Sequence, residues 1–91
     1  FPEDAMEKAM LAVTKELKQY VAKNVPKEVK VSTQALQGKS HKEILRESKA
    51  VSADLIVIPS HNYTKVNKAL LGSTTSRVVE RAKVSVMVIK P

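Results

Sequence analysis

The chain lacks cysteine and tryptophan, and it has few aromatic residues of any kind: Phe1, Tyr20 and Tyr63. The absence of cysteine excludes disulfide bonds, zinc–thiolate sites and cysteine nucleophiles. With so few aromatic side chains, the protein lacks the stacking platforms that nucleic-acid-binding proteins usually add to a basic surface. No apolar run approaches the roughly 18 residues of a membrane span. We therefore expect one small domain over residues 1–91.

Positive charge is in excess. Lys and Arg together number 16 against 9 Asp and Glu, which gives a formal net charge of +7. A pI ≈ 9.8 favours anionic partners through long-range electrostatic steering. Small phosphate ligands, acidic proteins and anionic lipids all remain open as partners, whereas nucleic acid is not expected.

Hydrophobic periodicity predicts a long amphipathic helix at the start of the chain. Five apolar residues follow a 4-3-4-4 spacing, which places them on one helical face and marks that face as core: Met6, Met10, Val13, Leu17 and Val21. Asn24 and Pro26 indicate where the helix stops. Beyond Pro26, alternating apolar and polar residues predict a short strand over residues 29–33.

The rest of the chain alternates between helix and strand signals. Ser40 stands three residues before Glu43, a capping-box pattern that predicts a second helix. The apolar run from Leu55 to Ile58 predicts a strand buried on both faces of a parallel sheet. Ser73 is the expected N-cap of a third helix, and a last apolar strand runs from Val84 to Ile89. The inner side of the third helix is expected to consist of Val78, Val79 and Ala82. This alternation predicts an α/β domain with right-handed crossovers.

Ligands of open parallel sheets bind beyond the carboxyl ends of the strands, where loops meet helix N-termini. Two segments of the sequence have this position, residues 34–40 and residues 59–73, and the second is the more informative about ligand binding. No acidic residue occurs between Asp54 and Glu80. A glycine that enters a helix lets the backbone approach an anion, and Ser73 and Thr74 add hydroxyl and N–H groups. This corner is predicted to bind phosphate, with an ordinary helix start at Gly72 as the alternative.

No catalytic or metal-binding arrangement is recognisable. His61 lacks a carboxylate or nucleophile partner, and His41 follows directly on a helix cap. We interpret both as solvated or hydrogen-bonding residues. Two histidines without suitably spaced carboxylates predict no metal site.

Residues 41–91 carry the pattern of a known family. The pattern is the strand at 53–58, a twelve-residue loop, the sequence Leu-Leu-Gly-Ser at 70–73, a helix with Arg-Val-Val at 77–79 and the apolar end at 84–89. In these features the chain resembles the carboxyl half of a universal stress protein domain. The resemblance implies a Rossmann-like fold of the adenine-nucleotide alpha hydrolase type, an open parallel sheet with helices on both faces.

The nucleotide-binding members of this family carry Gly-x-x-Gly, nine residues and then Gly-Ser or Gly-Thr. Here Pro59 and Asn62 replace the two leading glycines, and Gly72 and Ser73 match at the same spacing. Pro59 has no N–H and a fixed φ, whereas Asn tolerates left-handed backbone. ATP or AMP is the implied cofactor, and we expect weak or absent binding by this chain alone. The implied phosphate contacts are Gly72, Ser73 and Thr74, followed by Ser60 and Asn62.

The resemblance also implies a five-stranded sheet ordered 3-2-1-4-5, of which this chain would supply strands three to five. The first two strands are missing from the sequence, so we expect an incomplete domain. The start at Phe1 favours a separate amino-terminal segment that completes the sheet. Exchange of elements with a second copy, or direct pairing of the three strands, are the alternatives.

The function implied by the resemblance is that of a cytoplasmic, non-enzymatic regulatory domain in the stress response, homodimeric through the strand from Val84 to Ile89. The alternative is a cytosolic interaction module that binds no nucleotide, such as a regulatory domain of a membrane transporter. In that case the basic loop with Lys65 and Lys68 would meet an acidic protein or lipid headgroups.

Overall fold

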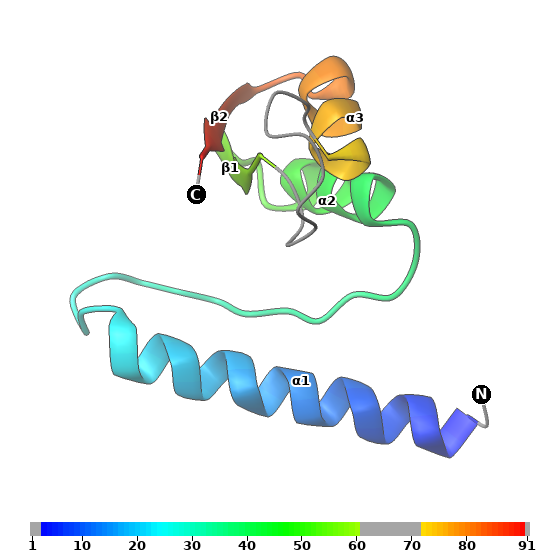
Figure 1. Ribbon diagram of the computed structural model, residues 1–91. Coiled ribbons are helices and arrows are strands. Elements are labelled where there is room, and N and C mark those ends of the chain that lie inside the picture. Colours follow the sequence, from blue (N-terminus) through cyan, green and yellow to red (C-terminus); the bar gives the residue numbers. More distant parts are fainter. Residues whose placement is uncertain (1–2, 61–71, 91) are drawn as a thin grey trace. The chain divides into compact units, whose positions relative to one another are not determined.

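The computed structural model describes residues 3–60 and 72–90. The chain divides into two compact units, residues 1–36 and residues 37–91 (Figure 1). The first unit contains helix α1 (Glu3–Asn24) and an extended segment. The second contains α2 (Ser40–Ala50), β1 (Leu55–Pro59), α3 (Ser73–Arg81) and β2 (Ser85–Ile89).

Helix α1 ends where the sequence predicts. Asn24 is its last residue, and the side-chain Nδ2 of Asn24 donates a hydrogen bond of 2.9 Å to the carbonyl oxygen of Tyr20. Acidic residues in the first turn and Lys23 in the last turn suit the helix dipole. No residue of α1 is buried, and Val13 is 46% exposed. Of the face that the spacing marked as core, Val13 is exposed and the other four residues are partly buried, so none of them reaches full burial.

The strand predicted over residues 29–33 does not form, and this prediction is wrong. The segment is extended, but within residues 3–60 and 72–90 the strands are β1 and β2. Val29 and Val31 are both exposed. A strand needs a neighbour with which to exchange backbone hydrogen bonds, and alternation along one segment does not supply it.

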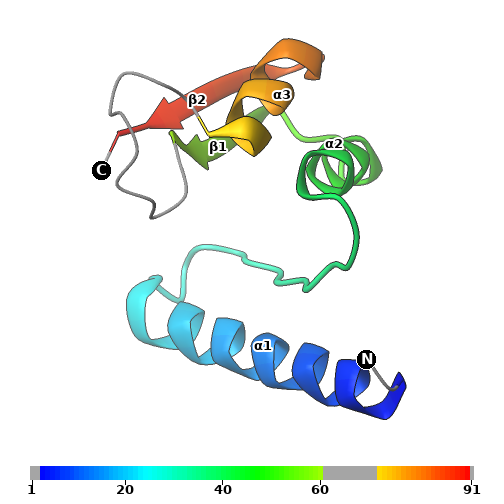
Figure 2. The ribbon, with the colours of Figure 1, turned by 45° about the vertical axis from the view of Figure 1, so that its right-hand side comes forward.

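Strands β1 and β2 form a parallel pair with Leu55 opposite Ser85 and Pro59 opposite Ile89. Helices α2 and α3 lie on the same side of this pair (Figure 2). The core consists of Ile56 and Ile58 from β1 and Val78 from α3, which is completely buried. Partly buried residues surround it: Ile44, Leu45, Ala82, Val84, Val86 and Val88. The α/β class and the parallel sheet are confirmed, and with two strands the domain is partial.

The second face of the two-stranded sheet is exposed in this unit. Val57 is 57% and Met87 49% exposed, and Leu55 and Ile89 are exposed as well. Burial in β1 thus alternates along the strand, whereas the sequence predicted burial on both faces. Val79 of α3 also points away from the core and is exposed. The helices of this unit cover one face of the sheet.

Helices α2 and α3, which follow Gly38 and Gly72, each have their N-cap one residue earlier than the sequence predicts. Lys39, and not Ser40, is the N-cap of α2, and no side-chain capping bond forms there. The Glu43 N–H donates instead to the Lys39 carbonyl at 3.0 Å. Gly38 has φ 141°, and a Cβ at this position would lie 2.8 Å from Oε1 of Glu43. The turn before α2 therefore requires glycine, and the Glu43 side chain fills the space beside it.

Candidate functional site

The two ends of the loop between β1 and α3 meet at the carboxyl end of the sheet. The Ser60 N–H donates to the Ile89 carbonyl at 2.9 Å, which extends the ladder by one residue beyond β1. The Gly72 N–H donates to the Ser60 carbonyl at 2.7 Å. Ser60, Gly72 and the residues that follow Gly72 are thus brought together at the corner where parallel sheets bind ligands.

Thr75 fixes the first turn of α3 to this corner. Its side chain is buried, and its Oγ1 donates a hydrogen bond of 2.5 Å to the Pro59 carbonyl. Sequence reasoning missed Thr75. The available signal was a hydroxyl in the first turn of a helix that follows a glycine, but the sequence does not show which strand end it reaches.

The start of α3 supplies free backbone donors. Gly72 is the N-cap, and Ser73, predicted as the cap, is the first helical residue. The first helical bond runs from the Ser76 N–H to the Gly72 carbonyl at 2.9 Å. The N–H groups at residues 73–75 therefore have no acceptor within the helix, and the helix dipole makes this end attractive to an anion.

The predicted site residues differ in how open they are. Ser73 is exposed and Thr74 is partly exposed, so both hydroxyls are near solvent. Ser60 is buried, and the N–H of Gly72 is engaged with the Ser60 carbonyl. Asn62, His61 and the loop lysines Lys65 and Lys68 lie outside the described residues. Phosphate binding at this corner stays a prediction.

Other chemistry is limited in the part of the chain that the structure describes. No group of three or more His, Asp or Glu side chains within residues 3–60 and 72–90 could hold a metal ion. No helix among those residues is both long and apolar enough to cross a membrane. His41, predicted to be solvated or hydrogen-bonded, is buried between α2 and α3 and lies 3.5 Å from Arg81.

A parallel sheet with a helix that begins at the carboxyl end of β1 defines an α/β domain of the Rossmann-like class. Comparison with protein families narrows this class, because residues 2–90 match the model of the universal stress protein family. The chain belongs to the universal stress protein family.

Two curated relatives come from Methanocaldococcus jannaschii. Universal stress protein MJ0531 is 37% identical over 62 residues, which cover 68% of this chain and 36% of the relative. Universal stress protein MJ0577 is 32% identical over 72 residues, which cover 74% of this chain and 44% of the relative. The chain spans less than half the length of these relatives.

Proposed function

We propose that this chain is a regulatory domain of the stress response that works by binding and not by catalysis, and that alone it binds ATP or AMP weakly or not at all. Membership of the universal stress protein family supports the first part. The proposal of weak nucleotide binding rests on the Gly72 corner, by which we mean the place where Ser60 and Gly72 meet at the carboxyl end of the sheet. A cytoplasmic location belongs to the same proposal.

The observation that carries the weak-binding proposal is how the backbone donors of the corner are used. Pro59 has no N–H to offer, and the N–H of Gly72 donates to Ser60. A phosphate that docks here meets the N–H groups at residues 73–75 without these two additional donors. A hydrogen bond to a charged group contributes about 1.5–3 kcal/mol, so each missing donor lowers the affinity about tenfold or more.

Isothermal titration calorimetry with ATP and AMP tests this proposal. We expect no saturable binding at micromolar nucleotide. The double variant Pro59→Gly with Asn62→Gly restores the glycine pattern of the nucleotide-binding members, and we expect it to bind at least about tenfold more tightly. Pro26→Gly, outside the corner, is the matched control and should change nothing. Stoichiometric micromolar binding by the unmodified chain would overturn the proposal.

We further propose a homodimer through β2. This strand pairs with β1 on one edge, and no strand among the described residues pairs with the other. An apolar strand with an open edge favours pairing with a second copy. The alternative is a separate amino-terminal segment that adds strands at an open edge of the sheet. Co-purification of a second polypeptide with this chain would identify such a segment.

The second candidate function is an interaction module without nucleotide. The exposed apolar face formed by Leu55, Val57, Met87 and Ile89 favours it, because large apolar patches mark interaction surfaces. The basic loop would add attraction to an acidic protein or lipid. In this case the double variant Lys65→Glu with Lys68→Glu should lose binding to anionic vesicles, while Lys15→Glu with Lys18→Glu on α1 should retain it.

A further inference from the structure

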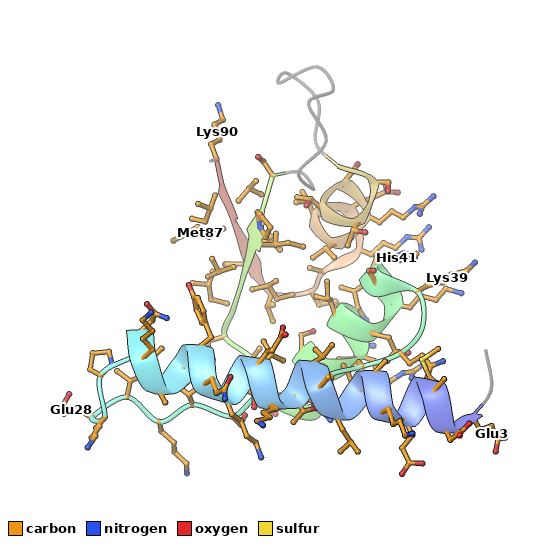
Figure 3. All side chains as sticks on the ribbon, turned by 60° about the horizontal axis from the view of Figure 1, so that its bottom comes forward. Glu3, Glu28, Lys39, His41, Met87 and Lys90 are labelled. Carbon is orange, nitrogen blue, oxygen red and sulfur yellow. The ribbon has the colours of Figure 1, made fainter. Side chains whose placement is uncertain are left out.

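Helix α1 carries a stripe of apolar side chains, none of which is fully buried. Figure 3 shows this helix lengthwise, with Glu3 at its beginning. Thr14 belongs to the same face, because it is partly buried and its hydroxyl donates to the Met10 carbonyl at 2.8 Å. The residues of this face, called the α1 stripe below, are Met6, Met10, Val13, Thr14, Leu17 and Val21. Tyr20 lies beside them and is 66% exposed.

The spacing of the α1 stripe is the same in both directions along the helix. From Met6 to Val21 the steps are 4, 3, 1, 3 and 4 residues. An antiparallel copy of α1 therefore matches the stripe, with Met6 opposite Val21, Met10 opposite Leu17 and the two-fold axis between positions 13 and 14. In this arrangement Met10 of the second copy meets a shallow hollow on α1, and methionine adapts well to irregular gaps. The hollow is lined by Val13, Glu16, Leu17 and Tyr20.

The charges of α1 are complementary in the same antiparallel arrangement. The first turn contains Glu3 and Asp4 and the last turn contains Lys23, so opposite charges and opposite dipole ends come together. Glu7 and Lys18 lie on one flank of the α1 stripe, about three turns apart. Glu7 of one copy then lies within about two positions of Lys18 of the other, or about 3 Å along the axis. Neither residue has an opposite charge three or four positions away in its own helix.

We propose that α1 pairs with α1 of a second copy of this chain, antiparallel and through the α1 stripe. A pair of helices of 22 residues is weak alone, and each exposed ion pair adds little. The inference therefore rests on the homodimer proposed through β2, which would hold the two copies of α1 at a high local concentration. It goes beyond that proposal by giving the dimer a second contact, made by the other unit of the chain.

Charge reversal in the full chain tests this pairing. Lys18→Glu places two glutamates beside each other at both symmetric contacts and should weaken the dimer about tenfold in sedimentation equilibrium. Glu7→Lys should do the same with two lysines. Lys15→Glu changes the net charge as Lys18→Glu does, but it lies on the opposite face of α1 and should leave the dissociation constant unchanged. An equal mixture of the Glu7→Lys and Lys18→Glu chains should dimerise with parental affinity, because both contacts again join opposite charges.

The absence of cysteine allows a second measurement. Val13→Cys brings two thiols together beside the two-fold axis and should give a disulfide-linked dimer under mild oxidation. Leu11→Cys, at a position that is 64% exposed on another face of α1, should not.

The outcomes separate this pairing from the β2 dimer. If a segment of the same chain or a different protein covers the α1 stripe, Lys18→Glu will dimerise as tightly as Lys15→Glu and Val13→Cys will not cross-link. This result, or a mixture of the two single variants that fails to regain affinity, would overturn the α1 pairing and leave the β2 dimer intact. A parent chain that stays monomeric would overturn both proposals.

Discussion

The Thr75 hydroxyl donates a hydrogen bond of 2.5 Å to the carbonyl oxygen of Pro59, across 16 positions of sequence. This bond joins the first turn of α3 to the last residue of β1. Thr75→Val removes the donor, keeps the shape and leaves the Pro59 carbonyl without this partner. We expect the free energy of unfolding to fall by about 0.5–1.5 kcal/mol, measured by urea denaturation.

Two variants control for this prediction. Thr75→Ser retains the hydroxyl and should recover most of the lost stability, while Thr74→Val changes a neighbouring, less buried hydroxyl and should cost little. If Thr75→Ser is as unstable as Thr75→Val, packing of the methyl group and not the hydrogen bond anchors the corner.

Much of this fold was predictable because its elements carry strong local signals. The boundary of α1 at Asn24 follows from Asn24 and Pro26, and the limits of β1 follow from the apolar run that ends in Pro59. The features that the sequence did not predict depend on contacts with other segments of the fold. The segment at 29–33 alternates like a strand but has no pairing partner, and Val57 is apolar but lies on the open face of the sheet.

The same distinction applies to the site. That Ser60 and Gly72 come together follows from a parallel strand that feeds a helix at one edge of the sheet. The anchoring by Thr75 depends on which side chain of the first turn faces β1, and no spacing rule gives it. The contact between His41 and Arg81 was missed because the two residues are 40 positions apart in sequence. Only the packing of α3 against α2 brings the two side chains together.

The two faces of the sheet should differ sharply in their tolerance to truncation. Ile58 is buried against Val78, so Ile58→Ala should lower the free energy of unfolding by about 2–5 kcal/mol. Met87 lies on the open face and is 49% exposed, so Met87→Ala should cost less than about 1 kcal/mol. Urea denaturation of both variants measures this. A large cost for Met87→Ala would show that the open face is covered in solution.

The outer edge of β2 is expected to pair with a second copy. The Ser60 N–H donates to the Ile89 carbonyl, so the backbone groups of Ile89 face β1 and, by alternation, those of Val88 face the open edge. Val88→Pro removes an outward N–H and should convert a dimer to a monomer in analytical ultracentrifugation. Val88→Ala loses the side chain but keeps the N–H and should remain dimeric. A dimer that persists in Val88→Pro would exclude pairing through this edge.

His41 should make the stability of the second unit sensitive to pH. Burial, and then the cations of Arg77, Arg81, Lys42 and Lys39, hold the pKa of folded His41 below its usual value, which is about 6.5. The unfolded chain therefore takes up this proton first as the pH falls. Stability that depends on the neutral ring is present above about pH 6.5 and is lost as the pH falls through the folded pKa. His41→Gln keeps a neutral hydrogen-bonding group for Arg81, and its urea midpoint should change less between about pH 7.5 and about pH 5.5, one unit either side of the usual pKa. His61→Gln should keep the steeper dependence of the parent, because it retains His41. Parallel curves for His41→Gln and the parent would mean that protonation of His41 does not limit stability in acid.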